Sequence, residues 1–238
     1  MNVLVAGCSF ALSLAPFIKK HIAGAKVTNL SSSGVGNKYI SDSVVLATSA
    51  VDYDLVYVSW TGLSRYDVCI SSEHKSLFND WTNQKNLFDK YYVCTGGVGG
   101  WDYHDHAFAN MLFKNYHTFV DHEQLYYNSI LEIVKIQSYL KGIGVPAYFT
   151  CMINQFKADP DTMAKHTCEY GTGRFPALKN LIEKIDFDSW LLEDGLGIYE
   201  NCARLGLLSE DQFHPSMQGY SYWIDKFANR LKNDKILL

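Results

Sequence analysis

A serine near the amino terminus and an aspartate–histidine pair near the carboxyl terminus together carry the groups of a proton relay. Asp211 precedes His214 by three residues, so on a tight turn its carboxylate can reach the Nδ1–H of the imidazole and fix the tautomer. The other ring nitrogen, Nε2, is then free to take a proton from the hydroxyl of Ser9. These three residue types predict acyl transfer through a covalent serine ester.

The position of Ser9 in the chain suits a nucleophile. Residues 2–6 are typical of a short buried strand, Gly7 permits a sharp turn, and the pattern predicts a helix over residues 11–21. Ser9 therefore stands at a strand-to-helix turn, where its hydroxyl is presented at the edge of a sheet.

Three short blocks resemble the SGNH, or GDSL-type, serine hydrolases. Residues 7–10, Gly-Cys-Ser-Phe, correspond to the first block, and residues 29–34, Asn-Leu-Ser-Ser-Ser-Gly, fit the second. Residues 211–219, Asp-Gln-Phe-His-Pro-Ser-Met-Gln-Gly, match the last block, so the resemblance spans nearly the whole chain. It implies that Ser9, His214 and Asp211 are catalytic. It also implies that the N–H groups of Ser9 and Gly34 face the oxyanion.

Two positions depart from the family pattern. The third block, Gly-x-Asn-Asp, normally supplies an asparagine to the oxyanion hole, but residues 55–65 contain none. Thr61 and Ser64 are the hydroxyl candidates for this third donor, whose loss costs about a hundredfold or more in rate. Cys8 replaces the usual aspartate and is an alternative nucleophile, since thiolates at helix N-termini are activated. Ser9 matches the family register, so we expect Cys8 to pack against the sheet.

Apolar strand-like segments alternate with amphipathic helical segments along the chain. Strands are predicted at residues 2–6, 26–30, 55–60 and 145–152, and further helices at residues 37–50, 124–141, 199–205 and 216–232. Residues 185–192 fit either a fifth strand or a short helix. The alternation, like the resemblance, predicts a three-layer α/β/α sandwich with a mainly parallel, flavodoxin-like sheet of about five strands. Ser9, Gly34 and His214 should meet at the carboxyl ends of its strands.

Length and composition indicate a single domain, residues 1–238, because a chain that is 47% hydrophobic can bury a substantial core. Residues 66–122 break the alternation and are too long for an ordinary connection. We expect an insertion that lies over the active-site face or forms a homo-oligomer contact.

The glycine run of this insertion, residues 96–100, lacks the lysine of a phosphate-binding loop. His104 and His106 lack an assigned third ligand, so neither a metal nor another cofactor is expected.

The net charge indicates which classes of partner are excluded, and the cysteine pattern indicates the cellular compartment. A formal net charge of -4 offers no basic surface for nucleic acid or for an anionic membrane. Six cysteines without a Cys-x-x-Cys pair predict reduced thiols, and no signal peptide or membrane-spanning run is recognised. A cytoplasmic protein is expected. A weak likeness to SGNH-like proteins of viral genomes adds a virus-associated alternative.

The resemblance implies a small-molecule or glycan ester as substrate, with an O-acetyl group on a carbohydrate as the first candidate. An acyltransferase that moves the acyl group to a sugar hydroxyl would carry the same residues. A non-catalytic, glycan-binding or structural protein of the same fold is a third alternative, because the third-block asparagine is missing. In that case Ser9 and Asp211 would be capping residues and His214 a surface histidine.

Overall fold

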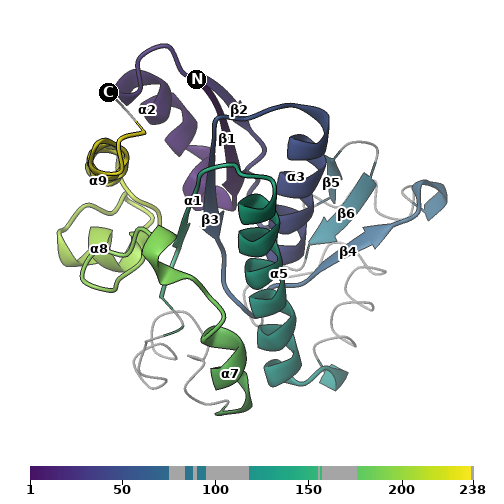
Figure 1. Cartoon of the computed structure of the whole chain (residues 1–238). Coiled ribbons are helices and arrows are strands. Elements are labelled where there is room, and N and C mark those ends of the chain that lie inside the picture. The colour runs from purple at the N-terminus through teal and green to yellow at the C-terminus, as the bar shows by residue number, and fades with distance from the viewer. Residues whose placement is uncertain (75–83, 88–89, 95–117, 155, 157–175, 237–238) are drawn as a thin grey trace.

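Four parallel strands form the central sheet of this computed structural model, which describes residues 1–74, 84–87, 90–94, 118–154, 156 and 176–236 (Figure 1). The strands are β1 (Asn2–Gly7), β2 (Lys26–Asn29), β3 (Leu55–Trp60) and β7 (Ala147–Cys151). They lie in the order β2-β1-β3-β7. All four correspond to segments that the sequence predicts as strands, which confirms the mainly parallel α/β fold.

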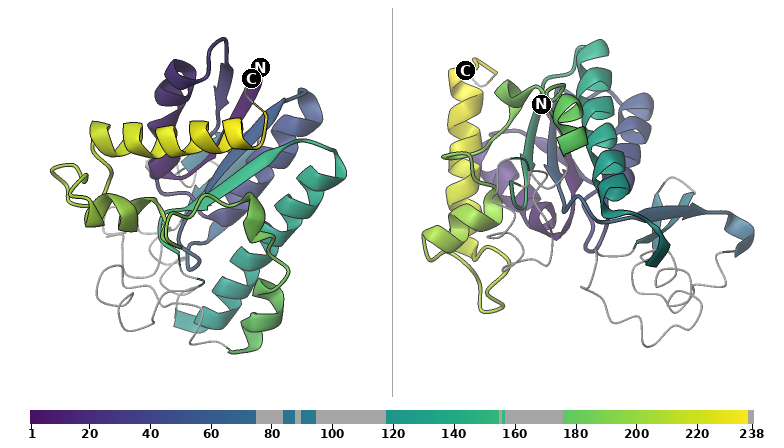
Figure 2. Two further views of the ribbon diagram at one scale, coloured as in Figure 1. Left: turned by 60° about the vertical axis from the view of Figure 1, so that its left-hand side comes forward. Right: turned by 90° about the horizontal axis from the view of Figure 1, so that it is seen from below.

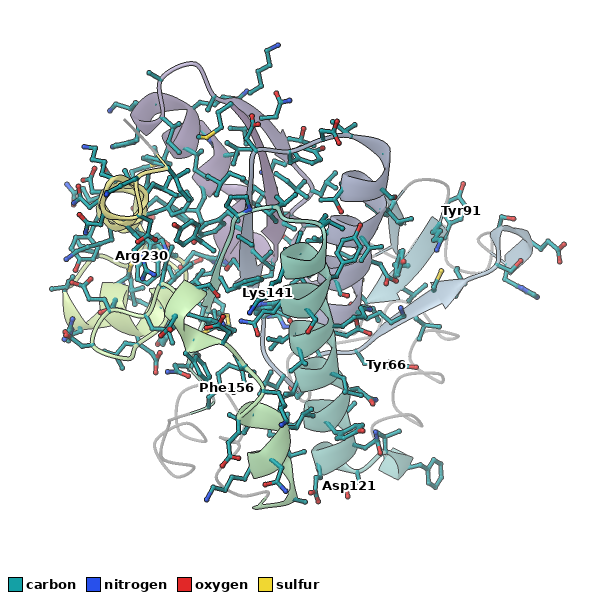
Figure 3. All side chains as sticks on the ribbon, viewed as in Figure 1. Tyr66, Tyr91, Asp121, Lys141, Phe156 and Arg230 are labelled. Carbon is teal, nitrogen blue, oxygen red and sulfur yellow. The ribbon has the colours of Figure 1, made fainter. Side chains whose placement is uncertain are left out.

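Helices cover both faces of this sheet. They are α1 (Ser9–Leu12), α2 (Leu14–His21), α3 (Asn37–Ala50), α5 (His122–Gly142), α7 (Lys179–Ile182), α8 (Ile198–Arg204) and α9 (Met217–Asn233). On one face α3 packs against α5, and on the other α2 packs against α9, as Figures 1 and 2 show. Side chains fill the space between the layers (Figure 3). The arrangement is the predicted three-layer sandwich.

The two central strands are buried on both faces. Residues 3–6 of β1 have no exposed surface, and every residue of β3 is buried, which explains why both sequences are apolar apart from Ser59. Gly7 pairs with Ser59, and Trp60 pairs with Cys151. Strands β1, β3 and β7 therefore end at one common edge of the sheet.

The helix predicted over residues 11–21 is divided in two at Ser13. Pro16 has no N–H to donate to the carbonyl of Leu12, four residues earlier. That carbonyl instead accepts a hydrogen bond from Asn29 Nδ2 at 3.1 Å. The break thus ties the end of β2 to the end of α1.

The described part of the sheet has four strands, compared with an expected number of about five. Within residues 185–192 the chain forms a 3₁₀ helix, Phe187–Ser189, and then a single parallel bridge between Trp190 and Phe149 of β7. The Asp186 carboxylate accepts a hydrogen bond from the backbone N–H two residues later at 3.1 Å. This local cap turns the chain before it can extend along β7.

The predicted insertion contains a second sheet. Its strands are β4 (Asp67–Ile70), β5 (Gln84–Leu87) and β6 (Lys90–Cys94). They are antiparallel in the order β4-β6-β5 and lie beside α3, on the side away from β1 (Figure 1). The glycine run at residues 96–100 and the histidines of residues 104–106 lie outside the described residues.

In the part of the chain that the structure describes, no helix is long and apolar enough to cross a membrane. The cysteines described there form no disulfide.

We expect Tyr57→Phe to lower the free energy of unfolding by about 1–3 kcal/mol, because Trp223 Nε1–H donates to Tyr57 Oη at 3.0 Å in the core and would lose its acceptor. Urea denaturation measures this change. Tyr139→Phe is the matched control, since the Thr48 hydroxyl that it contacts also donates to the carbonyl of Val44. Equal stability of the Tyr57 variant and the wild type would contradict a structural role for this pair.

Candidate active site

The turn between β1 and α1 presents Ser9 at the carboxyl edge of the sheet. A Cβ on Gly7 would lie 2.7 Å from Ala11 Cβ and 2.8 Å from the Ser59 carbonyl oxygen, so only glycine allows this close approach. Cys8 is extended and precedes α1, which makes Ser9 the first helical residue. The N–H of a first helical residue has no acceptor within its own helix and is available to a ligand.

The two ends of the chain meet at Ser9. His214 Nε2 lies 2.9 Å from Ser9 Oγ, and His214 Nδ1 lies 2.6 Å from Asp211 Oδ2. Both distances are within hydrogen-bond reach. The structure thus joins the three predicted residues in one line, serine to imidazole to carboxylate, across 205 positions of sequence.

Asp211 is fixed by more than its contact with the imidazole. Its Oδ1 accepts hydrogen bonds from Ser209 Oγ at 2.7 Å, from Phe213 N–H at 2.9 Å and from His214 N–H at 2.8 Å. Oδ2 is therefore held toward the ring. The pKa of Asp211 is well below its ordinary value, because the Ser209 hydroxyl first, and then His214 and the backbone amides, donate to the carboxylate.

A backbone hairpin supports the aspartate–histidine turn. Ser209 N–H donates to the His214 carbonyl at 2.8 Å, and Ser216 N–H donates to the Leu207 carbonyl at 2.7 Å. Gln212, at the tip, has φ +55°, in the left-handed region that few residues other than glycine adopt. The Ser216 hydroxyl then accepts from the N–H three residues later and caps α9. Helix α9 consequently begins just after the histidine, as predicted.

Two aromatic rings enclose the imidazole. The centroid of Phe10 lies 5.1 Å from that of His214, and the centroid of Phe213 lies 5.2 Å away in an edge contact. Phe10 is fully buried, whereas His214 and Asp211 keep about a third and a half of their side-chain surface exposed. The rings restrict the imidazole on the inner side and leave the outer side open. Sequence reasoning missed this role, although both rings neighbour site residues in the chain.

The segment that resembles the second block, residues 29–34, lies directly against the turn that carries Ser9. Asn29 Oδ1 accepts from Ser31 N–H at 3.0 Å, and Ser32 N–H donates to the Gly7 carbonyl at 3.0 Å. Gly34 has φ +76°, a conformation that side-chain-bearing residues rarely adopt. The predicted oxyanion loop is thus hydrogen-bonded to the turn that carries the serine.

The two hydroxyl candidates for the third donor differ in their surroundings. Thr61 follows β3 and is 3% exposed, and its Oγ1 has no hydrogen-bond partner among the described residues. Ser64 is also buried, but it is engaged in an interaction. Leaving a buried hydroxyl unpaired costs folding free energy, so of the two candidates Thr61 is the one whose hydroxyl lacks a partner among the described residues.

An asparagine that the sequence did not single out contacts the third-block loop. Asn37, the first residue of α3, is 1% exposed and accepts from Thr61 N–H at 3.1 Å. Its Nδ2 lies 3.5 Å from the Thr61 carbonyl oxygen and 3.4 Å from that of Gly62. Asn37 holds the backbone on either side of the Thr61 hydroxyl. Only the folded backbone reveals this contact, because the two segments are 24 residues apart.

Cys8 has no exposed surface and lies in the hydrophobic core, as expected. The residue in contact with His214 is Ser9. The alternative metal ligands, His104 and His106, lie outside the described residues.

We expect Ser209→Ala to raise the pKa of Asp211, because the hydroxyl is the largest cause of its depression. A depressed carboxyl pKa stabilises the fold above the unfolded value of about 3.9, and this contribution is lost as the pH falls through the folded pKa. The variant should therefore lose stability at a higher pH than the wild type, below about pH 4. Melting temperatures measured from pH 7 to pH 2 test this. Ser49→Ala is the control, because its exposed hydroxyl donates only to a carbonyl, and an identical acid profile for the two variants would contradict the assignment.

The fold is similar to that of solved hydrolases at very low sequence identity. The psychrotrophic esterase EstA of Pseudoalteromonas sp. shares 8% identity with a TM-score of 0.50, and the match covers 99% of each chain. The lipase Lip_vut3 from a goat rumen metagenome shares 11% identity with a TM-score of 0.49, and the match covers 96% of each chain. No protein-family model and no curated protein matches the chain. At these identities the likeness to the esterase concerns the fold.

Proposed function

We propose that this chain is a serine ester hydrolase of the SGNH type, with Ser9 as nucleophile, His214 as general base and acid, and Asp211 as the residue that orients the imidazole. One observation carries the proposal: the continuous contact from Ser9 Oγ through both ring nitrogens of His214 to Asp211 Oδ2. If Ser9 only capped a helix and His214 were only a surface histidine, nothing would require the two side chains to be in contact. The likeness of the fold to that of an esterase is consistent with it.

The reaction follows from the arrangement of the groups. As Ser9 Oγ attacks the ester carbonyl carbon, His214 Nε2 takes the hydroxyl proton, and a tetrahedral oxyanion forms. The bond to the leaving alcohol then breaks, and the imidazolium returns the proton to the alcohol oxygen. A water molecule repeats both steps on the acyl-enzyme and releases the carboxylic acid and free Ser9.

Asp211 stabilises the imidazolium without taking its proton. The depressed pKa of this carboxyl keeps it ionised when the imidazole is charged. Its three additional donors prevent the carboxylate from rotating away from the ring.

The oxyanion would be bound by the N–H groups of Ser9 and Gly34 and by the Thr61 hydroxyl. Ser9 N–H opens α1 and has no acceptor within that helix, and Thr61 Oγ1 is buried without a partner among the described residues. A donor already placed for the charge that develops in the transition state costs no reorganisation during the reaction. Thr61 would then replace the family's asparagine, with Ser64 as the alternative.

The substrate we propose is a small acyl ester, such as an O-acetyl group on a carbohydrate. The family resemblance supports this choice. Transfer of the acyl group to a sugar hydroxyl uses the same first half-reaction, so product analysis with and without a sugar acceptor distinguishes a transferase from a hydrolase.

Hydrolysis of short-chain aryl esters should be abolished by Ser9→Ala and by His214→Ala and reduced less by Asp211→Asn, because the imidazole still takes the proton without its orienting carboxylate. A fluorophosphonate probe followed by peptide mapping should label Ser9. Ser13→Ala, a serine at the neighbouring helix junction, is the control and should keep its activity. A purified protein that neither hydrolyses esters nor reacts with the probe would contradict the hydrolase proposal and favour a binding protein.

Thr61→Val should lower kcat by about a hundredfold with little change in KM, because the hydroxyl is needed chiefly in the transition state. The same change should leave stability unchanged or raise it by about 1 kcal/mol, since it removes an unpaired buried hydroxyl. Steady-state kinetics and urea denaturation measure the two effects. Ser64→Ala is the comparison, and a larger loss of kcat in that variant would assign the third donor to Ser64 instead.

A further inference from the structure

Asp67 is a buried carboxylate that the proposed reaction does not use. It is the first residue of β4 and is 2% exposed. Its Oδ1 accepts from Gly36 N–H at 2.7 Å, and its Oδ2 accepts from Tyr39 N–H at 2.9 Å. Burial raises the pKa of Asp67, and the backbone amides, the Cys94 thiol and Arg65 oppose that rise. The carboxylate thus occupies the amino end of α3.

Asp67 performs the capping that the start of α3 lacks. The N-cap residue of this helix is Gly36, which has no side chain to accept from the first turn. A Cβ on Gly36 would lie 2.8 Å from Asp67 Oδ2, so the glycine makes room for a cap supplied 31 residues later. A negative group at this end is also favoured by the helix dipole.

The residues whose amides Asp67 binds, Gly36 and Tyr39, lie shortly after the proposed oxyanion donor Gly34 in the segment of residues 34–37 and the first turn of α3. Arg65 Nη1 donates to the Val35 carbonyl at 3.3 Å, and Asn37 binds the backbone of Thr61. Each of these contacts joins the segment to the chain that leaves β3. The Gly34 amide therefore lies two residues before an amide that Asp67 binds, and the Thr61 hydroxyl belongs to a residue whose backbone Asn37 binds.

The same carboxylate connects these contacts to the antiparallel sheet. Asp67 pairs with Cys94 of β6, and β4 leads directly from the third-block loop into the sheet beside α3 (Figure 1). Through Asp67, the described strands of the insertion are therefore hydrogen-bonded to the segment that contains Gly34.

We propose that Asp67 is a positioning residue for the oxyanion hole: by holding the amides of Gly36 and Tyr39, it fixes the backbone of residues 34–37 and, through Asn37, the loop of Thr61. The inference rests on the proposed function. Asp67 contacts no reacting atom. It acts by keeping backbone donors in place, and a displacement of about 1 Å at such donors costs about a hundredfold in rate.

The test compares Asp67→Asn with Asp42→Asn. An asparagine at position 67 can accept one of the two amides but turns its NH2 group toward the other. Asp42 is the matched control, because it also links α3 to the antiparallel sheet, accepting from Tyr92 Oη at 2.7 Å and from Lys38 Nζ at 2.8 Å, but it lies beyond the first turn of the helix. Gly36→Ala is a second variant. Alanine tolerates the extended backbone of Gly36, so its effect arises from the displaced carboxylate.

Asp67→Asn and Gly36→Ala should lower kcat and the rate of fluorophosphonate labelling at least about tenfold with little change in KM, whereas Asp42→Asn should stay within about twofold. Hydrogen exchange of the peptide spanning residues 34–37 should be faster in the first two variants only. An active wild type whose kcat is unchanged in folded Asp67→Asn and Gly36→Ala overturns the inference. If the wild type is inert to esters and probe, the proposed function fails. With an inert wild type, hydrogen exchange still tests the anchoring by Asp67. Unchanged exchange of residues 34–37 in Asp67→Asn and Gly36→Ala rejects that anchoring, and faster exchange in both variants supports it.

Discussion

The close backbone contact at Gly7 is the constraint on which the site depends. Its missing Cβ lets β1 end against the Ser59 carbonyl of β3, and its own carbonyl accepts from Ser32 N–H in the loop after β2. One residue therefore fixes the turn that carries Ser9 to both segments that would supply the proposed oxyanion donors. Any larger residue would separate β1 from β3 at the edge where Ser9 emerges, because a Cβ would overlap atoms of Ser59 and Ala11.

The buried polar groups discussed for this edge of the sheet are of two kinds, which have opposite effects on the free energy of folding. Asp67 and Asn37 are buried but paired with backbone groups, so they add rigidity without an unsatisfied partner. The Thr61 hydroxyl is buried and has no partner among the described residues, which opposes folding. A protein retains such a group more readily where a ligand completes its bonding, and a paired cluster around it offsets the cost. The paired contacts of Asp67 and Asn37 thus stabilise the same region of the fold that the unpaired Thr61 hydroxyl destabilises.

Local patterns in the sequence predicted the features that local physics controls. The buried strands β1 and β3, the closing helix α9 and the contact of His214 with Asp211 follow from periodicity, capping and a three-residue spacing. Residues 185–192 fitted either a fifth strand or a short helix, and the structure resolves this in favour of a 3₁₀ helix, because the Asp186 cap turns the chain there. Contacts such as those of Asn37 and Asp67 could not be predicted, since each joins segments at least 24 residues apart through a single side chain.

A site built in this way places few demands on the rest of the sequence. Two of the three proposed oxyanion donors are backbone amides, which any residues supply if the turns close correctly. If the proposed function holds, the strict requirements are Ser9, Asp211 and His214 together with glycines at close approaches and left-handed positions, such as Gly7 and Gly34. Apart from Thr61 and the polar residues that would position these donors, such as Asp67 and Asn37, the remaining positions need only preserve burial and strand order. A chain can share 8% identity with an esterase of solved structure and still have a similar fold, because cores tolerate extensive hydrophobic substitution when volume and pattern are kept.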